Sequence, residues 1–373
     1  MIKVLHVADK FGVRGSSVHG VSRLFSWWLP RFDAGRYDVR LVGLRKPDEA
    51  CESLQRHGIE VRSLNKGKFD VSTVSALVGI IKQSGAQILH LHGYGSSNFG
   101  RVAARAAGVK TIVHEHFVDP AMPAYQTPFD YALARWTDRG IAVSASVKAF
   151  MVRRRFIPAE RVDVIFNGAP LDEFQPVNGE AAAVERRRWQ IPQDTTVVAS
   201  IGRLDEQKGN RYLLEAAAQL VRRGRRLTVL IVGDGPLMDA LKTQCRQLQI
   251  EREVIFTGYQ TDIPRIQSIV DIQVFPSLWE GTPLTLFEAM AMQRSVVATP
   301  VDGLGEVLRH GENAFLVPPR DPDRLAAAIE ALLLNPREAE RLAAQALRDS
   351  RGFDIQRTVE SIQRIYDGLM ETA

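Results

Sequence analysis

The chain has 373 residues, of which 45% are hydrophobic and 24% charged, a composition that excludes a mainly disordered protein. Its two cysteines, Cys51 and Cys245, lie far apart in sequence, which excludes a disulfide framework and a cysteine-based zinc site. The net charge is +5, but residues 1–175 carry 24 basic and 16 acidic side chains, a net charge of +8, together with seven of the eight histidines.

Short runs rich in valine and isoleucine alternate with helical patterns along the whole chain, which is typical of parallel sheets covered by helices. We therefore predict an α/β fold. The strands expected in the first half are Lys3–Ala8, Val39–Gly43, Gln87–Leu91, Thr111–His114, Gly140–Val143 and Val162–Phe166. The strands expected in the second half are Thr196–Ile201, Leu227–Val232, Val254–Phe256, Ile272–Phe275 and Ser295–Ala298.

The strand pattern restarts after a polar stretch at residues 176–188, which predicts two sheet domains of similar size. The first is expected to span residues 1–172 and the second residues 173–354. The last segment, Ile355–Met370, has the pattern of an amphipathic helix that could pack on either domain, so residues 355–373 could join the first. Ligands of such sheets bind beyond the carboxyl ends of the strands, which favours a site in a cleft between the domains.

The glycine-containing loops do not match the common nucleotide-binding motifs. Those at residues 12–15, 93–95 and 233–235 each lack the third glycine of the dinucleotide fingerprint at the right offset, which argues against a nicotinamide enzyme. The P-loop, zinc-protease and Gly-x-Ser-x-Gly patterns are also absent from the sequence. The residues that carry the chemistry must therefore lie elsewhere.

Residues 275–291 contain the most informative pattern in the chain. A strand ends there and a helix begins, with Thr282 expected as the N-cap and Pro283 at the first helical position. Leu284 and Thr285 would then present free backbone N–H groups at the positive end of the helix dipole. Such a helix start binds phosphate without a metal.

Two glutamates flank this helix start, Glu280 in the preceding loop and Glu288 in the second helical turn. Taken alone, they could be a pair of surface side chains. With its flanks, the stretch resembles the Glu-x7-Glu signature of retaining GT-B glycosyltransferases, in particular glycosyltransferase family 4. The resemblance covers most of residues 196–335 and includes Gly202-Arg203-Leu204 with Lys208-Gly209, residues 232–236, residues 296–303, Glu306, Gly311 and residues 315–319.

The resemblance is weaker in the first half, where it includes residues 164–168 with Asp172 and Phe174, and the stretch His114-Glu115-His116. The first glycine loop departs from the family, which often has adjacent glycines, because His19 precedes Gly20 here. This departure bears on how closely the backbone approaches a ligand, an approach that Gly20 could still allow.

The resemblance implies a GT-B fold, with two Rossmann-like domains facing across a cleft, and retaining, metal-independent transfer of a sugar from a nucleotide diphosphate, with UDP as the expected carrier. The donor is a substrate, so no cofactor is expected. Glu288 would hold the ribose hydroxyls and Glu280 would lie near the donor sugar. The residues implied in nucleotide and donor binding are Gly20, Arg203, Lys208, Gly233, Tyr259, Gly281, Leu284, Thr285 and Glu288.

Arg203 and Lys208 suit a diphosphate for a physical reason. Breaking the sugar–phosphate bond develops negative charge on the leaving group, and fixed cations aimed there lower the barrier. Arginine grips two phosphate oxygens, whereas lysine acts as a point charge, so we expect this pair to take the place of a metal and to act in catalysis with Glu280. The pair Asp321 and Asp323 opens a helix, and capping explains it better than metal binding does.

Histidines occupy strand ends in the first half. His114 and His116 end one expected strand, and alternation places both on one face, where either could orient a ligand hydroxyl or share its proton. The family has an active-site histidine at this strand end, and the histidine that does not fill that role would be a buried structural residue. His90 and His92 repeat the spacing on another strand, but zinc would require a convergence that the sequence does not show, so we expect no metal.

The basic first half could face an anionic membrane, nucleic acid or a phosphorylated small molecule, or could simply be a solvated surface. Trp27 and Trp28, with Arg153, Arg154 and Arg155, could form an aromatic and basic face that touches anionic lipid, or the tryptophans could belong to the core.

No stretch reaches the roughly 18 apolar residues of a membrane span, so we expect a cytoplasmic protein, with peripheral contact at the inner membrane face left open. The resemblance implies hexosyl transfer to a hydroxyl acceptor, such as a lipid-linked or envelope glycan. Alternatives are a transferase acting on a small soluble metabolite, a nucleotide-sugar epimerase of the same fold, and a basic nucleic-acid-binding protein. The complete Glu-x7-Glu stretch argues against the epimerase, and we expect no nucleic acid partner.

Overall fold

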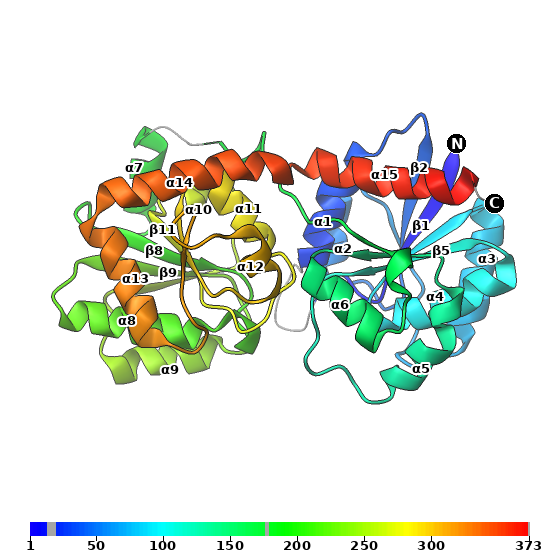
Figure 1. Ribbon diagram of the computed structural model, residues 1–373, viewed down its shortest axis with the longest axis horizontal. Coiled ribbons are helices and arrows are strands. Elements are labelled where there is room, and N and C mark those ends of the chain that lie inside the picture. The colour runs from blue at the N-terminus through cyan, green and yellow to red at the C-terminus, as the bar shows by residue number, and fades with distance from the viewer. Residues whose placement is uncertain (13–19, 176–178, 372–373) are drawn as a thin grey trace. The chain divides into compact units, whose positions relative to one another are not determined.

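Two parallel sheets, each flanked by helices, make up the fold (Figure 1). The structure is a computed structural model that describes residues 1–12, 20–175 and 179–371. The chain divides into unit 1, Met1–Asn167 with Ile355–Ala373, and unit 2, Gly168–Asp354. This division falls after Asn167, whereas we expected it after Asp172.

The sheet of unit 1 has seven strands in the order β3-β2-β1-β4-β5-β6-β7, and all neighbouring strands pair in parallel. The strands are β1 Ile2–Ala8, β2 Tyr37–Gly43, β3 Val61–Ser63, β4 Ile88–His92, β5 Lys110–Glu115, β6 Arg139–Ala142 and β7 Val162–Val164. The six predicted strands are present. The prediction missed β3, because an edge strand of three partly exposed residues has no apolar run to reveal it.

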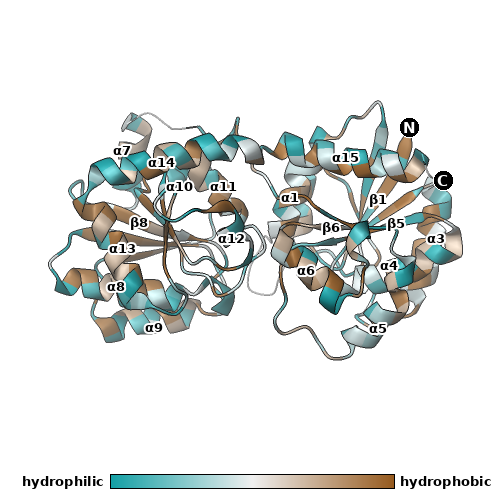
Figure 2. Ribbon diagram, viewed as in Figure 1, coloured by the Kyte–Doolittle hydropathy of each residue, from teal (hydrophilic) through white to brown (hydrophobic). Residues whose placement is uncertain are grey.

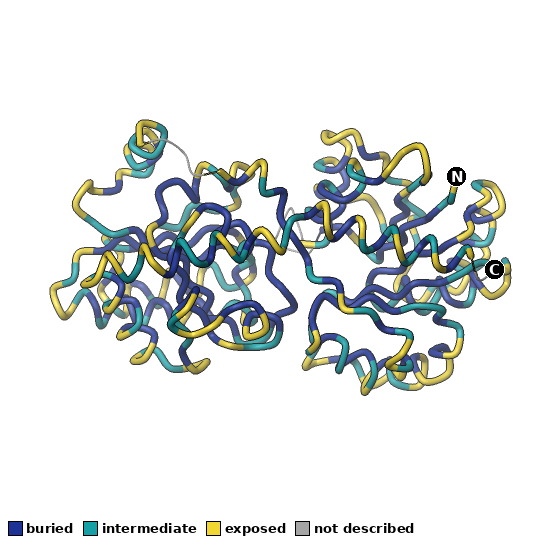
Figure 3. Tube along the Cα trace, turned by 45° about the horizontal axis from the view of Figure 1, so that its top comes forward, coloured by how far each residue is buried: buried dark blue, intermediate teal, exposed yellow. Residues whose placement is uncertain are grey.

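The helices of unit 1 shield a central core. They are α1 Gly20–Trp28, α2 Glu49–Arg56, α3 Ser72–Ser84, α4 Tyr94–Ala107, α5 Gln126–Leu133, α6 Ala145–Arg154 and α15 Ile355–Glu371. All five residues of β4 are buried, because a central parallel strand is covered on both faces. The apolar strands and buried inner helix faces are apparent in Figures 2 and 3.

Helix α15 returns the chain to unit 1 after it has passed through unit 2. Its buried residues, which include Ile355, Val359, Ile362 and Tyr366, recur every three or four positions and form one apolar face. The hydroxyl of Tyr37 donates a 2.6 Å hydrogen bond to Asp367, which also pairs with the neighbouring Arg36. The C-terminal helix is therefore a structural part of the first sheet unit.

The sheet of unit 2 has six parallel strands in the order β10-β9-β8-β11-β12-β13. The strands are β8 Thr196–Ile201, β9 Leu227–Val232, β10 Val254–Gly258, β11 Ile272–Phe275, β12 Ser295–Ala298 and β13 Phe315–Leu316. Its helices are α7 Gly179–Arg188, α8 Asn210–Arg222, α9 Met238–Leu248, α10 Ile263–Gln267, α11 Leu284–Ala291, α12 Asp302–Val307, α13 Pro322–Leu334 and α14 Pro336–Ser350. The five predicted strands are present, and the two-residue β13 is again an edge strand that the pattern missed.

Both sheets reverse their strand order beside their first strand. In unit 1, β1 lies between β2 and β4, and in unit 2, β8 lies between β9 and β11. At such a switch point the connections leave in opposite directions and open a crevice beyond the carboxyl ends of the strands. The residues that follow β8 and β11, and those that end β4 and β5, therefore occupy the positions where this fold places ligands.

Candidate functional site

The carboxyl ends of β8 and β11 bring a lysine and a glutamate together. Lys208 ends a short 3-10 helix, Glu206–Lys208, after β8, and its Nζ lies 2.5 Å from Oε1 of Glu280, which follows β11. Gln207 and Ser277 also donate hydrogen bonds to the Glu280 carboxylate, at 3.2 and 2.9 Å. Three side chains thus hold the Glu280 carboxylate. A phosphate that binds Lys208 would do so while the lysine also contacts Glu280.

Arg203 lies two residues beyond β8, partly exposed, and its Nη1 is 3.3 Å from Asp205. An ion pair that is only partly buried contributes little, so the guanidinium can exchange its partner for a ligand at little energetic cost. Arg203 and Lys208 flank the same loop between β8 and α8. The loop therefore offers two cations at the carboxyl edge of the sheet.

Helix α11 begins at Leu284, and its N-cap is Pro283, not Thr282 as the sequence predicted. The ψ angle of Pro283 is 132°, so this residue is still extended, and the first helical position falls one residue later than expected. Leu284 and Thr285 nevertheless stand in the first turn, where backbone N–H groups lack acceptors within the helix. The helix start keeps the donors that an anion requires.

Glu288 lies in the second turn of α11 and is fully buried, while Glu280 is 3% exposed. The alternative of two surface glutamates is therefore wrong. Because desolvating a charge is expensive, a buried carboxylate needs polar partners, which Lys208, Gln207 and Ser277 provide for Glu280. Their burial at the ends of β11 and α11 supports a role in a site.

Two glycines allow the loops of unit 2 to touch. A Cβ atom on Gly233, after β9, would lie 1.9 Å from the carbonyl oxygen of Gly202, and its φ of 132° also disfavours any side chain. A Cβ on Gly303 would lie equally close, at 1.9 Å, to the carbonyl oxygen of Gly281. Tyr259 follows Gly258, whose carbonyl oxygen accepts a 2.9 Å hydrogen bond from the Gly233 N–H, and it is 38% exposed, so its role in donor binding stays a prediction.

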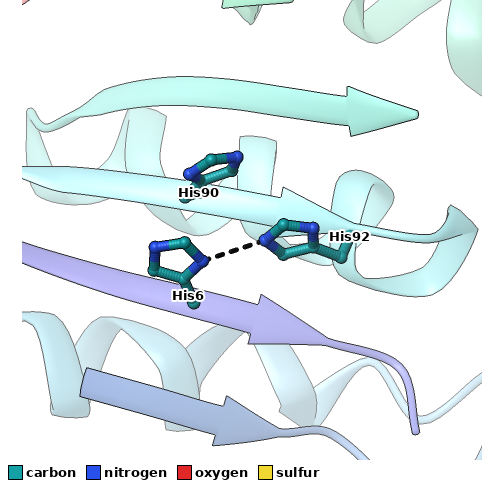
Figure 4. A group of neighbouring side chains, drawn as sticks. All are labelled: His6, His90 and His92. Carbon is teal, nitrogen blue, oxygen red and sulfur yellow. Dashed lines mark hydrogen bonds between the residues drawn. The ribbon is translucent and has the colours of Figure 1, made fainter. Parts of the chain in front are cut away.

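In unit 1, the histidines at the ends of neighbouring strands form a stacked cluster. The rings of His114 and His116 lie 4.4 Å apart and nearly parallel, so the prediction that they share one face is confirmed. His90 and His92 join them from β4, and His6 joins from β1, where its register partner is His90 (Figure 4). The sequence analysis missed His6, although its place near the end of a valine-rich strand is the same signal.

Burial keeps these imidazoles neutral. It lowers the pKa of His6 from 6.5 to about 3, and it holds the pKa values of His90, His92 and His114 well below 6.5, with repulsion from neighbouring histidines as a further cause. His116, just beyond β5, is only partly buried. His116 is therefore the member of the cluster closest to the surface.

The convergence that a metal site requires is present among the described histidines. The nitrogens of His6, His90 and His92, and those of His92, His114 and His116, lie within 4.8 Å of one another. However, the nitrogen contacts of 2.9 and 3.0 Å match hydrogen bonds, whereas ligands of a tetrahedral metal would stand about 3.3 Å apart. The geometry favours hydrogen bonds between the imidazole rings over coordination of a metal ion. That the protein binds no metal stays a prediction.

Of the two alternatives left open for Trp27 and Trp28, a lipid-facing surface and the core, the core is confirmed. Trp27 and Trp28 are 6% and 0% exposed and belong to the core, and the Trp28 ring stacks on His114 at 5.3 Å. Arg155 is also fully buried, because it pairs with Glu115 and Asp130.

Arg101 completes this buried network with a 2.7 Å contact to Asp130. Burial raises the pKa of Glu115 from 4.5 to about 7, although Arg155 opposes this shift.

Two further expectations concern single residues. Gly20 is the first residue of α1, exposed, with open space around its Cβ position, whereas His19 lies outside the described residues. Asp321 caps α13 by accepting a 2.9 Å hydrogen bond from the Arg324 backbone, so the capping interpretation is confirmed.

Comparison with known proteins shows what this chain is similar to. A family model described as "Glycosyl transferases group 1" matches residues 182–349, and one described as "Glycosyltransferase Family 4" matches residues 18–173. The UDP-Gal:alpha-D-GlcNAc-diphosphoundecaprenol alpha-1,3-galactosyltransferase of Escherichia coli is 26% identical over 80% of this chain and 79% of its own. The alpha-D-kanosaminyltransferase of Streptomyces kanamyceticus is 30% identical over 68% of this chain and 69% of its own.

Solved structures share the fold. A glycosyltransferase from Rickettsia africae matches 100% of this chain and 99% of its own with a TM-score of 0.86 and 18% identity. Anabaena HepE, solved in complex with UDP, matches 98% of this chain and 100% of its own with a TM-score of 0.86 and 21% identity. No helix in the described ranges is long and apolar enough to cross a membrane. The chain is therefore an enzyme that belongs to the group 1, or family 4, glycosyltransferases, a retaining family of GT-B fold.

Proposed function

We propose that the protein transfers a hexose, with retention, from a UDP-sugar to a hydroxyl of a lipid-linked glycan. The observation that carries this proposal is the buried Glu280 held by Lys208 at the carboxyl ends of β8 and β11, beside the start of α11. A cation, backbone donors and a buried carboxylate near one helix start provide what a sugar diphosphate requires: charge neutralisation and acceptors for hydroxyl groups.

The roles of the residues follow from the charges of the reaction. As the sugar leaves, negative charge grows on the diphosphate, and Arg203, Lys208 and the N–H groups of Leu284 and Thr285 stabilise it without a metal. Glu288 accepts hydrogen bonds from the ribose hydroxyls, and Glu280 lies near the donor sugar. Because Glu280 neutralises Lys208 before the donor binds, the diphosphate meets a cation that is already oriented.

A lipid-linked acceptor is supported by the Escherichia coli relative, whose name specifies a diphosphoundecaprenol acceptor and UDP-Gal. Other relatives named D-inositol 3-phosphate glycosyltransferase act on a small phosphorylated molecule, so a soluble acceptor is the second candidate. A panel of UDP- and GDP-sugars, offered with undecaprenyl-linked or soluble acceptors, tests both. Sugar isomerisation without any acceptor would instead support an epimerase.

The nucleotide site is tested by calorimetry with UDP. Glu288→Gln keeps the size of the side chain and removes its charge, so UDP affinity should fall about tenfold or more, as expected for lost hydrogen bonds to a charged group. Glu340→Gln, at an exposed position of α14, is the matched control and should bind UDP as the wild type does. An unchanged affinity of Glu288→Gln would remove its ribose role.

The phosphate site is tested by transfer assays. Arg203→Ala combined with Lys208→Ala should abolish transfer, whereas Lys242→Ala with Arg246→Ala, two exposed positions of α9, should not. An active Arg203/Lys208 double variant would show that the diphosphate binds elsewhere. Turnover should persist in a chelator, and a loss that Mn²⁺ restores would contradict metal-independent transfer.

For contact with an anionic membrane, exposed side chains of α5, of the end of α6 and of Phe156 just after α6 provide a surface. Phe129, Tyr131 and Phe156 are 51%, 73% and 38% exposed, and Arg153 and Arg154 are exposed beside them. Aromatic and basic side chains together favour the interface of anionic lipid.

Vesicles of phosphatidylglycerol should sediment the wild type, but not Phe129→Ser combined with Tyr131→Ser. Leu334→Ser, at another exposed apolar residue, is the control. Equal sedimentation of all three proteins would contradict this contact.

A further inference from the structure

Unit 1 contains a basic pocket at the amino edge of its sheet, the edge opposite to the strand ends that carry His114 and His116. The pocket has a volume of about 800 Å³ and lies among the first residues of β5 and β6, the residues around the start of β7, and α15. Its described lining side chains include five cations and two carboxylates, which leaves an excess of three positive charges. The cations are Lys110, Arg135, Arg139, Arg161 and Arg364, and the carboxylates are Asp138 and Asp163.

Both carboxylates of the basic pocket already have partners. Asp163 accepts a hydrogen bond from the Arg139 guanidinium, whose Nη2 lies 2.5 Å from Oδ2 of the carboxylate. Asp138 accepts hydrogen bonds from the backbone N–H and the hydroxyl of Thr111, at 2.8 and 3.1 Å, and Nζ of Lys110 lies 3.8 Å from its other oxygen. The two carboxylates therefore serve the cations nearest to them.

The other three arginines, Arg135, Arg161 and Arg364, form no ion pair with a carboxylate in the ranges that the structure describes. Two of them are nevertheless held in place. Arg161 donates a 3.0 Å hydrogen bond to the carbonyl oxygen of Thr137, and Arg364 donates one of 2.7 Å to the Ser361 hydroxyl. Because these acceptors are neutral, they orient the guanidinium groups without compensating their charge.

We propose that the basic pocket is a second anion site of this protein, which binds a phosphorylated ligand. Cations that are crowded together repel one another, and a bound anion relieves this repulsion. Arginine is the side chain that grips two phosphate oxygens at once, and guanidinium groups that are already oriented lose less entropy on binding. The inference goes beyond the proposed function, because the residues assigned to sugar transfer lie at the carboxyl edges of the two sheets.

The size and the walls of the basic pocket indicate a ligand larger than phosphate alone. Its volume falls within the roughly 300–1,000 Å³ that is usual for sites of small organic molecules. Val164, which is 37% exposed, and the partly buried Ile365 add apolar surface to the lining. The ligand should therefore carry its phosphate on an organic group, as a phosphorylated metabolite and a phospholipid headgroup both do.

Calorimetry with inorganic pyrophosphate tests the basic pocket directly. The measurement starts from Arg203→Ala combined with Lys208→Ala, which removes the cations of the proposed donor site. This variant should still bind pyrophosphate. Adding Arg161→Gln and Arg364→Gln should weaken that binding about tenfold or more, as expected for lost hydrogen bonds between charged groups. Absence of binding to the starting variant, or an affinity that the added substitutions leave unchanged, would overturn the proposal.

The matched control adds Arg105→Gln and Arg357→Gln to the starting variant instead. These arginines are exposed on α4 and α15 and do not line the pocket, so the affinity for pyrophosphate should not change. An equal loss in the control would show that overall charge attracts the anion, and would overturn the proposal. Arg161→Gln with Arg364→Gln in the otherwise unchanged enzyme should bind UDP as the wild type does, so failure of the pocket and failure of the donor site give different results.

Competition experiments identify the source of the phosphate. Glucose 6-phosphate should displace pyrophosphate from the starting variant if the ligand is a soluble phosphorylated metabolite. Vesicles of phosphatidic acid and phosphatidylcholine should displace it, and vesicles of phosphatidylcholine alone should not, if the ligand is a lipid headgroup. Displacement by neither the sugar phosphate nor phosphatidic acid would contradict a site for an organic phosphate.

Discussion

Acidification should unfold unit 1 before unit 2, because the histidine cluster must stay neutral in the folded state. His6, His90, His92 and His114 have pKa values below 6.5 when folded and take up protons when unfolded. Groups with a depressed folded pKa contribute stability above the unfolded pKa and lose it as the pH falls. When the pH falls from 7.5 to 5.5, each of these histidines lowers the free energy of unfolding of unit 1 by about 1.4 kcal/mol, and the four together lower it by about 5 kcal/mol.

Glu115 acts in the opposite direction. Its folded pKa of about 7 exceeds the ordinary value of 4.5, so its contribution is fully present below pH 4.5 and is lost as the pH rises through 7. Through Glu115, the same acidification therefore raises the free energy of unfolding of unit 1 by about 2 kcal/mol. The effect of the histidines is the larger one, so the free energy of unfolding of unit 1 should fall by about 3 kcal/mol. This is a large share of the roughly 5–15 kcal/mol that stabilises a typical protein.

Hydrogen exchange measured by mass spectrometry at pH 7.5 and 5.5, corrected for intrinsic rates, provides the assay. Peptides from β4 and β5 should lose protection from exchange relative to peptides from β8 and β9. The latter belong to unit 2, whose one histidine in the sequence is His310. His90→Gln should reduce the pH-dependent loss by about a quarter of the histidine total, whereas His57→Gln, at an exposed position, should not. Equal losses in both units would refute the reasoning.

Other substitutions test the buried network and the loop contacts. Arg155→Met leaves Glu115 buried without its cation and should destabilise unit 1 by about 3–5 kcal/mol, whereas Arg154→Met, on the exposed face of α6, should change its stability by less than about 0.5 kcal/mol. Urea unfolding measures both, and similar midpoints would contradict a structural role for the Arg155 pair. Gly233→Ala should lower UDP affinity in calorimetry and the thermal midpoint of unit 2, because its Cβ would clash with the carbonyl of Gly202. A variant with wild-type stability and affinity would show that these loops can separate freely.

Local patterns were sufficient for most of the fold. The strands of both sheets are apolar runs that parallel sheets bury on both faces, as in β9, where all six residues are buried. The sequence analysis did not predict the edge strands β3 and β13, because two or three partly exposed residues do not form an apolar run. The start of α11 was predicted one residue early, because the φ angle of proline suits both an extended cap and a first helical residue.

For the candidate site, the chain itself revealed the residue types and their spacing. Glu280, Glu288, Arg203 and Lys208 stand at strand and helix ends that the sequence predicts, because order along the chain determines which groups reach the carboxyl edge of a sheet. The direct contact between Lys208 and Glu280 came only from the structure, because the pair is separated by 72 residues.

Tertiary structure alone decided the environments of the side chains. The sequence could not tell that Trp28 and Arg155 are buried, that His6 joins four other histidines, or that Tyr366 from the far end of the chain links them. Periodicity reports which face a residue occupies, but burial, and therefore charge state and hydrogen bonding, depends on which distant segment covers that face. The sequence alone thus determined the family and the chemistry of the groups, and the packing of α1, α6 and α15 determined which of those groups are neutral, paired or exposed.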